Sequence, residues 1–392
     1  MNLETGSISA GQPIDLGNDP IPAKAYYDPE WYELERQAVF MRSWIQCGHI
    51  SEIPEPGSFI RREFEFARAS LLITRGRDGE VRAMHNVCTH RGTQLTQESC
   101  GKQSKFSCKY HMWTFGSDGA LLSAPDFERF GIDKSACALP RVACEVVAGL
   151  IFVNFDPQQS LREYLGPLAD QMETVPVARA TCFSEYVYEI NANWKLTYDN
   201  FQENYHLRFI HPKTGEATFD ESNPFGYPEY VELHDPHRTQ RIWTNPNAAE
   251  RMTPFQMMKF GAGMKRLAED GLIGAPTAKD YFALFPNFFM LGSPGNNFSH
   301  TVMPLGPEKS RGVIRLYWVG EDRSASTRFA REAAMATTRD IHGEDVSVIE
   351  AGQRGLSSGA LEHILFQEKE VLCRHLYLMV AKAVADHQAG KQ

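Results

Sequence analysis

The sequence predicts an α+β protein of two domains, and three observations lead to this prediction. The chain has 392 residues, which is too long for one ordinary small domain. Residues 45–155 show short strand-like runs separated by turn residues, which is typical of antiparallel β structure. Residues 156–392 mix long helical stretches with strands. We therefore expect a helical N-terminal segment over 1–44, a β domain over 45–155 and a larger mixed domain over 156–392.

The N-terminal segment is predicted to begin without regular structure and to become helical over 29–44. Its first residues contain Gly, Pro and Ser, which break regular elements. The later apolar residues fall near helical spacing: Trp31, Leu34, Ala38 and Met41. We expect this helix to pack on the larger domain.

The β domain shows repeated hairpin signals. A strand is predicted over 70–74, a turn over 77–79 and the next strand over 81–84. Asp118-Gly119 repeats the turn signal, and 146–156 is predicted to be one buried strand that closes the domain. In the larger domain we expect a connector and a helix over 156–180, and a strand over 312–320.

Bulk properties exclude several classes of function. The net charge of −9 argues against a nucleic-acid partner, which would require a basic face. Residues 1–19 lack the features of a signal peptide, and no apolar run is long enough to span a bilayer. We expect a cytoplasmic protein without a membrane partner, and the cysteines outside the motif below agree with a reduced compartment because they are scattered singly. These are Cys47, Cys100, Cys137, Cys144, Cys182 and Cys373.

The most informative motif in the β domain combines cysteine with histidine. Cys88 and His90 form one pair, and Cys108 and His111 form a second pair after 17 intervening residues. Two thiolates and two imidazoles can hold a [2Fe–2S] cluster in which the cysteines bind one iron and the histidines bind the other. A structural zinc site is the alternative, because Cys2His2 also suits zinc. Zinc sites usually begin with two like ligands, however, which this spacing does not provide.

A second constellation lies in the larger domain. If 193–206 forms one helix, Asp199, Glu203 and His206 share a face. Pro212 tends to end that helix at His211, so His211 can turn back toward a metal that His206 binds. Two histidines and one carboxylate would complete a facial triad for Fe(II). The alternative is a pair of ordinary core or surface histidines.

The best candidate for the carboxylate is Asp345. It falls on an apolar helical stripe, and an acid there is costly unless it is paired or binds a metal. The alternative is a buried Asp345 that caps a helix or pairs with an arginine, and we expect the neighbouring Glu344 to be solvated. The stripe consists of Ile341, Asp345, Val348, Ile349 and Gly352.

From about residue 40 to about residue 385, the sequence resembles the Rieske non-haem iron oxygenases, terminal (alpha) component of the aromatic-ring-hydroxylating dioxygenases. The resemblance implies an antiparallel-β Rieske [2Fe–2S] domain followed by a helix-grip catalytic domain with a mononuclear Fe(II). In this family the third iron ligand lies in an acid-rich segment, which Asp345 matches. Met112 departs from the family, which usually has glycine after the second cluster histidine.

The resemblance also implies a role for Glu203. A family acid at this position accepts hydrogen bonds from a cluster histidine of one subunit, here His111, and an iron histidine of the next, here His206. Such a carboxylate fixes both imidazole tautomers. Glu203 could instead be an ordinary helix-surface acid. Asp199 could support the metal site or be a plain helix acid.

The partners follow from what the resemblance implies and from missing motifs. The chain has neither a GxGxxG fingerprint nor a plant-type cluster motif, so electrons must come from a separate reductase, with or without a ferredoxin. The family arrangement implies at least a ring of subunits, most simply a homotrimer, and a beta subunit is a further option.

The substrate is left open by the sequence. Aromatic residues are frequent over 213–300, and some should line an apolar pocket over the iron while most belong to the core. We first expect a small aromatic substrate, which the protein would oxidise with O2 by ring dihydroxylation or monooxygenation. Oxidative demethylation of a quaternary amine or methoxy compound is the alternative. A Rieske electron-transfer protein without oxygenase activity is the contrasting class, which the length after the cluster motif disfavours.

Overall fold

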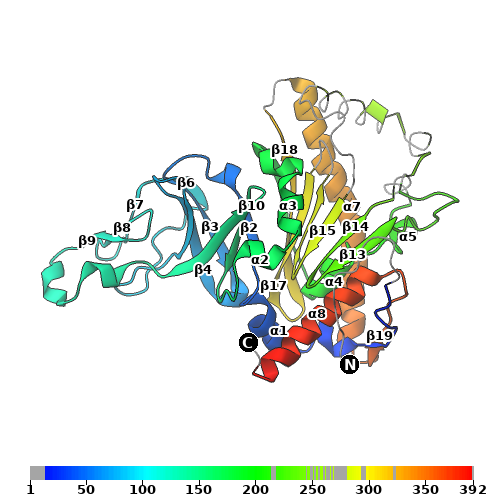
Figure 1. Cartoon of the computed structure of the whole chain (residues 1–392), viewed down its shortest axis with the longest axis horizontal. Helices are drawn as coiled ribbons and strands as arrows, with labels where there is room; N and C mark the ends of the chain where they lie inside the picture. Colours follow the sequence, from blue (N-terminus) through cyan, green and yellow to red (C-terminus); the bar gives the residue numbers. More distant parts are fainter. Residues whose placement is uncertain are drawn as a thin grey trace. The chain divides into compact units, whose positions relative to one another are not determined.

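The computed structural model of the chain describes residues 14–212, 218–243, 280–292, 297–320 and 324–390, with isolated positions between 245 and 268 (Figure 1). The chain forms two compact units. One unit contains residues 1–39 together with 165–392, and the other contains residues Phe40–Tyr164. The second unit is therefore an insertion in the sequence of the first.

The unit Phe40–Tyr164 consists of two antiparallel sheets. The larger sheet has the strand order β2-β11-β10-β5-β4-β3-β6, and the smaller has the order β7-β8-β9. The strands are β2 (Ile45–His49), β3 (Ser58–Phe64), β4 (Ala69–Arg75), β5 (Val81–His85), β6 (Cys100–Lys102), β7 (Lys105–Ser107), β8 (Thr114–Gly116), β9 (Leu121–Ser123), β10 (Arg141–Val147) and β11 (Leu150–Asn154).

Turn chemistry explains where these strands begin and end. The predicted hairpin turns are present, with Gly79 and Gly119 at positive φ values of 83° and 86°. The single strand predicted over 146–156 is wrong. Ala148 and Gly149 both adopt positive φ, at 52° and 73°, so a two-residue turn splits this run into β10 and β11.

The ends of this inserted unit meet each other. The indole Nε1 of Trp44 donates to the carbonyl of Gln159 at 3.1 Å. Nearby, the side-chain amide of Asn154 donates to the carbonyl of Arg42 at 2.9 Å. Helix α2 (Leu161–Leu165) follows and leads back to the other unit. Adjacent ends are what an inserted folding unit requires.

The other unit is built on a seven-stranded antiparallel sheet with the order β12-β18-β17-β16-β15-β14-β13. Its strands are β12 (Cys182–Ile190), β13 (Tyr230–His234), β14 (His237–Arg241), β15 (Asp280–Leu284), β16 (Phe288–Gly292), β17 (Asn297–Gly306) and β18 (Lys309–Trp318), and a separate pair joins β1 (Ile21–Pro22) to β19 (His363–Ile364). Its helices are α1 (Pro29–Glu35), α3 (Leu168–Glu173), α4 (Trp194–Asp199), α5 (Leu207–Ile210), α7 (Ala325–Ser357) and α8 (Val371–Gln388).

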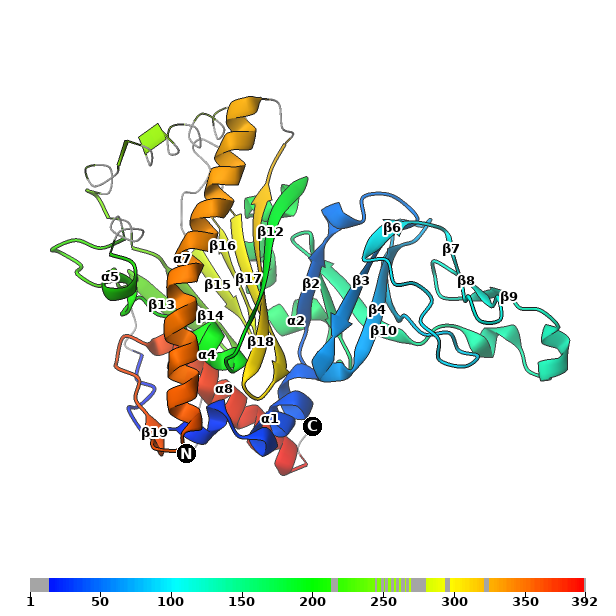
Figure 2. The ribbon, with the colours of Figure 1, turned by 180° about the vertical axis from the view of Figure 1, so that it is seen from behind.

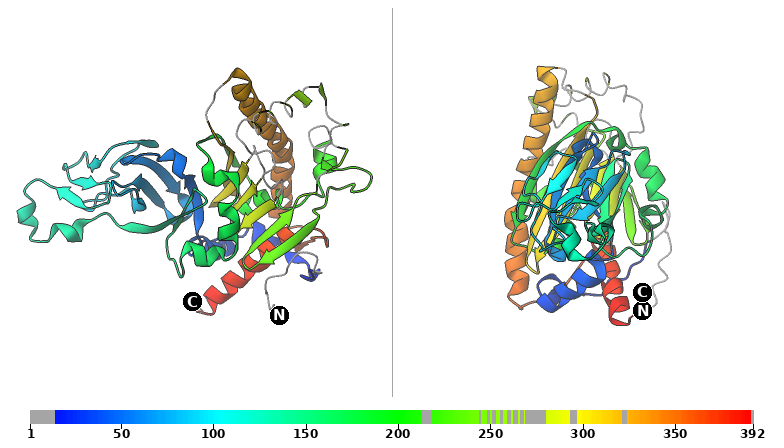
Figure 3. Two further views of the ribbon diagram at one scale, coloured as in Figure 1. Left: turned by 45° about the horizontal axis from the view of Figure 1, so that its top comes forward. Right: turned by 90° about the vertical axis from the view of Figure 1, so that its left-hand side faces the viewer.

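Helices cover both faces of this sheet. The long helix α7 lies along one face and α3 lies on the other (Figures 2 and 3). Ile349 of α7 packs among Tyr188, Ile190 and Ile314 of the sheet. No helix in the described part of the chain is both long and apolar enough to cross a membrane.

A buried ion pair ties the N-terminal segment to α4. The Nζ of Lys195 lies 2.5 Å from Oε1 of Glu35, and both side chains are fully buried. The indoles of Trp31 and Trp194 donate to the same carboxylate at 2.6 and 2.8 Å. Burial lowers the pKa of Lys195, and the charge of Glu35 opposes that change. A buried charge pair is tolerated only when it is hydrogen-bonded in this way.

Candidate active site

The two loops that carry the Cys/His motif have the same backbone shape. In the first, the Gly92 N–H donates to the carbonyl of Cys88 at 2.9 Å, and in the second the Met112 N–H donates to the carbonyl of Cys108 at 2.9 Å. Gly92 and Met112 occupy the equivalent left-handed position, with φ values of 78° and 59°. Met112 therefore carries a backbone conformation that usually requires glycine, and its side chain is exposed.

The structure brings the four predicted cluster residues together. Cys88 and Cys108 are buried, and the ring centroids of His90 and His111 lie 4.6 Å apart. Among the described atoms, Nδ1 of each histidine is buried and has no hydrogen-bond partner. Buried polar atoms normally have partners, so two orphaned imidazole nitrogens beside two thiols fit an iron–sulfur cluster. Cys100 lies apart on the exposed strand β6.

The backbone before His206 differs from the prediction. The continuous helix expected over 193–206 is wrong, because α4 ends at Asp199 and α5 begins only after His206. The carboxylate of Glu203 accepts the backbone N–H of His206 at 3.2 Å, and it also accepts the N–H of Tyr205. The Glu203 side chain thus replaces the backbone acceptors that a continuous helix would supply, and it caps the start of the next helical turn.

Asp199 is buried and is absent from the described lining of the metal pocket. Its carboxylate accepts a hydrogen bond from the Tyr26 hydroxyl at 3.0 Å. Burial raises the pKa of Asp199 to about 7, although the Tyr26 hydrogen bond opposes the rise.

His206, His211 and Asp345 come together although Asp345 is 134 residues beyond His211. One potential ligand atom from each lies within 4.8 Å of the others. Oδ1 of Asp345 lies 3.0 Å from Nε2 of His211 and 3.7 Å from Nε2 of His206. Two imidazoles and one carboxylate on one side leave further coordination positions open, so the residues fit a facial Fe(II) triad.

A carboxylate holds each of the two histidines from behind. Glu203 contacts Nδ1 of His206, and Oε2 of Glu344 lies 2.7 Å from Nδ1 of His211. An anchored Nδ1–H leaves the unprotonated Nε2 for a metal. Burial lowers the pKa of His211, but the nearby carboxylates of Asp345 and Glu344 raise it above its usual value overall.

Two expectations about α7 are corrected by these contacts. Glu344 is not simply solvated, because its carboxylate reaches His211 while about a third of the side chain remains exposed. The predicted stripe is also partly wrong, since Val348 and Gly352 are exposed. The buried stripe instead passes through His342, Asp345 and Ile349, which fixes the direction in which Asp345 points.

A cavity of about 320 Å³ opens over the three residues. Five aromatic side chains line it, and Tyr281 stacks on Phe289 with ring centroids 4.7 Å apart. The aromatic lining consists of Phe201, Trp243, Tyr281, Phe289 and Phe298. Other aromatics over 213–300, such as Phe282, Phe285 and Phe288, are buried core, and Phe255 and Phe260 lie outside the described residues.

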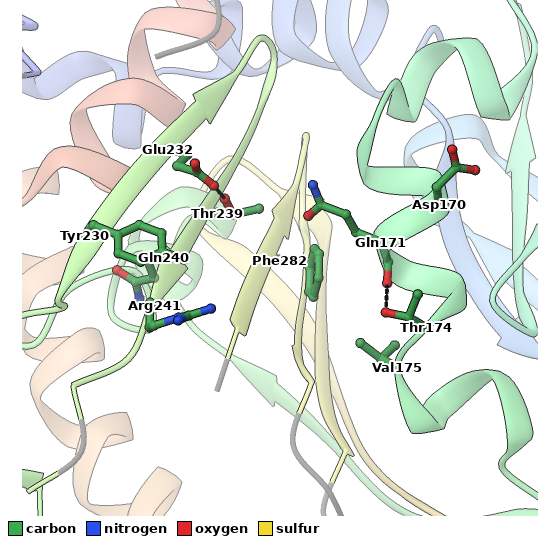
Figure 4. Close-up of a pocket in the computed structure, with 10 residues that line it drawn as sticks. All are labelled: Asp170, Gln171, Thr174, Val175, Tyr230, Glu232, Thr239, Gln240, Arg241 and Phe282. Carbon is green, nitrogen blue, oxygen red and sulfur yellow. Dashed lines mark hydrogen bonds between the residues drawn. The ribbon is translucent and has the colours of Figure 1, made fainter. Parts of the chain in front are cut away.

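A second hollow, of about 520 Å³, lies between α3 and the strands β13, β14 and β15 (Figure 4). On the sheet side it is lined by Phe282, which neighbours Tyr281 in the strand and therefore points to the opposite face. In Figure 4 Gln171 of α3 and Thr174, which directly follows that helix, line the other wall. None of the metal-site residues lines this hollow.

Sequence reasoning missed three residues of the pocket region. Glu344 is expected to be solvated, and neither His342 nor Asn200 is among the candidate site residues. The pair Glu344-Asp345 was the available signal, because adjacent acids near a metal offer both a ligand and a support.

Two Cys/His loops in one unit, and a His2Asp site under a cavity in the other, define the class of Rieske-type iron oxygenases. The family model for the Rieske [2Fe-2S] domain matches residues 43–143, and the model for the ring hydroxylating alpha subunit (catalytic domain) matches residues 177–386. The chain belongs to this family of ring-hydroxylating alpha subunits. It is an enzyme whose cofactors are a Rieske cluster and a mononuclear iron, and it oxidises a small organic substrate with dioxygen.

Individual relatives differ in what they oxidise. The glycine betaine monooxygenase oxygenase subunit of Chromohalobacter salexigens is 28% identical over 378 residues, covering 88% of this chain and 81% of that protein. The anthranilate 1,2-dioxygenase large subunit of Acinetobacter baylyi is 30% identical over 305 residues, covering 75% and 58%. A crystal structure of a quaternary ammonium Rieske monooxygenase in complex with L-carnitine has a TM-score of 0.74 at 23% identity, covering 94% of this chain and 96% of that one.

Proposed function

We propose that Cys88, His90, Cys108 and His111 hold the Rieske cluster, and that His206, His211 and Asp345 hold the mononuclear iron. The convergence of the two Nε2 atoms with Oδ1 of Asp345 under a cavity is the observation that carries this proposal. When bound, the iron activates dioxygen with electrons that the cluster delivers.

The residues of the chain prepare this chemistry. Glu203 and Glu344 fix the imidazoles of His206 and His211, so that both Nε2 atoms face the same point. The aromatic walls orient the substrate and keep water away from the reacting carbon. Asp199 is not among the described residues that line the cavity, and its carboxylate accepts a hydrogen bond from Tyr26.

We further propose that the substrate carries an alkylated ammonium group. Apart from histidines, the charged residues in the described lining are Glu203 and Asp345, and both are acidic. Both acids are assigned to the iron site, so the argument rests on the aromatic faces and on the lack of lysine and arginine in the described lining. Such a wall favours a cation that cannot donate hydrogen bonds, such as a quaternary ammonium group. Burial lowers the pKa of His342 in the same wall to about 4, so this histidine adds no opposing charge at neutral pH. The glycine betaine relative supports the same substrate class.

A neutral aromatic ring is the second candidate. The stack of Tyr281 on Phe289 offers a flat apolar wall against which such a ring could lie. The anthranilate relative supports this alternative, in which the ring would gain one or two hydroxyl groups.

Electron delivery is proposed to involve other proteins and other copies of this chain. A separate reductase, with or without a ferredoxin, would reduce the cluster. In a homotrimer, Glu203 of one copy would connect His206 to His111 of the adjacent copy, and a buried carboxylate between two imidazoles would fix both tautomers. A beta subunit is not required by this arrangement.

The test is a single turnover of the reduced, iron-loaded protein under ¹⁸O₂ with quaternary amines, aromatic acids and methoxyarenes. Insertion of one oxygen atom of O2 into a C–H bond next to the nitrogen would form a carbinol, while two electrons from the reduced protein and two protons convert the other oxygen atom to water. The carbinol would then lose its hydroxyl proton and its C–N bond would break, which releases a tertiary amine and a carbonyl compound. Release of these products from a quaternary amine supports the proposal. Two labelled oxygen atoms on an aromatic ring would establish the second candidate instead. Oxidation of the cluster without any organic product would contradict both.

A further inference from the structure

One wall of the metal pocket contains a histidine whose function the iron site does not explain. His342 lies on the buried stripe of α7, lines the cavity and is 1% exposed. Its Nδ1 lies 3.4 Å from the hydroxyl of Tyr186. Its Nε2 is buried and has no partner among the described atoms. A buried polar atom without a partner is rare in proteins and requires an explanation.

The contact with Tyr186 can set which nitrogen of His342 is protonated. A neutral imidazole has one donor nitrogen and one acceptor nitrogen. If the phenol hydroxyl of Tyr186 donates to Nδ1, the proton of the imidazole lies on Nε2. His342 then has a free N–H donor at the unpartnered atom.

Packing prevents this ring from turning away. The ring of Tyr188 lies 3.8 Å from that of His342, measured between centroids, and Phe201 stacks nearly parallel to it at 6.2 Å. Tyr188 is itself held by a 2.7 Å hydrogen bond between its hydroxyl and Nε2 of His300. The donor of His342 is therefore held in place before any ligand arrives.

A second donor in the same pocket is also unpartnered. The Nδ2 of Asn200 is buried without a partner, and Asn200 lines the cavity as His342 does. Among the described lining residues, the only unpartnered buried acceptor is Oδ1 of Asp345, which the iron site accounts for. Two donors are thus left over, and a ligand with a hydrogen-bond acceptor would satisfy them.

We propose that His342 determines specificity by donating its Nε2–H to an acceptor group of the substrate, such as a carboxylate oxygen. This inference rests on the proposed function and extends it, because the substrate would then carry both an alkylated ammonium group and an acceptor. The ammonium group would contact the aromatic wall, and the acceptor would bind His342. Tyr186 is the positioning residue that keeps the donor proton on Nε2.

The test compares ligands with and without the acceptor in iron- and cluster-loaded protein. Binding of glycine betaine, L-carnitine and tetramethylammonium is measured by calorimetry for the wild type and for His342→Phe, His342→Gln and Tyr186→Phe. Benzoate and toluene form a second pair. We expect His342→Phe to weaken the acceptor-bearing ligands by roughly 10- to 100-fold and to leave tetramethylammonium and toluene within about threefold.

The conservative variants separate recognition from structure. Glutamine can place an N–H near the position of Nε2, so His342→Gln should retain most of the binding, and Tyr186→Phe should have an intermediate effect. In single turnovers, His342→Phe should consume dioxygen with less product because the substrate is misplaced. Equal losses for both members of a pair would show a structural role and overturn the proposal. The proposal would also be overturned if His342→Phe left binding unchanged, or if the wild type bound no acceptor-bearing ligand. If only the aromatic pair behaves as expected, the ammonium proposal fails while the role of His342 stands.

Discussion

Replacing Glu344 tests whether the carboxylate behind His211 contributes to the affinity for iron. Its Oε2 lies 2.7 Å from Nδ1 of His211, which is the geometry that orients a metal-binding imidazole. Loss of such a partner typically costs about 10- to 100-fold in metal affinity, or about 1.4 to 2.8 kcal/mol. Since about a third of the Glu344 side chain is exposed, solvent screens its charge. We therefore expect the affinity for iron to fall by an amount near the lower limit of this range, about 10-fold.

Two substitutions grade this effect. Glu344→Gln keeps a neutral acceptor for the Nδ1–H and should weaken iron binding by about 10-fold or less, whereas Glu344→Ala removes the acceptor and should weaken it by more. The dissociation constant is measured anaerobically by competition between the cluster-loaded protein and a chromophoric Fe(II) chelator. The cluster spectrum should be unchanged in both variants, because the cluster residues lie in the other unit.

The control is Glu332→Gln, which removes an equivalent charge from the exposed face of the same helix. It should bind iron as the wild type does. If Glu344→Ala also retained the wild-type affinity, the carboxylate would have no role in orienting His211. Equal losses in Glu332→Gln and Glu344→Gln would attribute the effect to the net charge of α7.

Three further predictions concern stability. The pKa of Asp199 is about 7 in the folded protein and about 3.9 when unfolded, so only the unfolded state loses this proton between these pH values. The free energy of unfolding should therefore fall by up to about 4 kcal/mol as the pH rises through this window. Urea titrations at several pH values should show a smaller fall in Asp199→Asn. In Gly312→Ala the new Cβ would lie 2.1 Å from Cζ of Tyr188, so thermal unfolding should show a loss of about 1–3 kcal/mol in the free energy of unfolding. Gly343 has open space around it, so Gly343→Ala should lose no stability. Met112→Gly should relieve the backbone strain at φ 59° and raise the free energy of unfolding by about 1 kcal/mol or less. The cluster spectrum should be unchanged. A destabilised variant would show that the Met112 side chain makes a compensating contact.

Ligand chemistry and local spacing allowed much of the site to be predicted. The four cluster residues lie in two short loops, so their proximity depends mainly on hairpin geometry that a sequence indicates. His206 and His211 are five residues apart, and Pro212 limits the backbone between them. Asp345 was found because an acid on an apolar helical face needs a partner, and the structure shows that partner to be the two histidines.

The missing parts depend on tertiary contacts that periodicity does not encode. The break after Asp199 is stabilised by side-chain bonds from Glu203, which compete with the helix only in this local arrangement. The helical stripe through Asp345 predicts a buried Val348, but α7 turns His342 toward the sheet instead. Glu344 was expected to be solvated because its helical neighbours are polar, and only the folded position of His211 gives it a partner.

The ion pair between Glu35 and Lys195 determines where the chain can be divided. The region matched as the catalytic domain, 177–386, contains Lys195 but not Glu35, which lies at the end of α1. A fragment cut at those limits would leave a buried ammonium group without its counter-charge, and breaking such a pair typically costs about 3–5 kcal/mol. Exchange of the segment Phe40–Tyr164 between relatives would preserve the pair, because both partners lie outside it. For chimeric oxygenases, the inserted unit is therefore the transferable module, and residues 14–39 must stay with the catalytic fold.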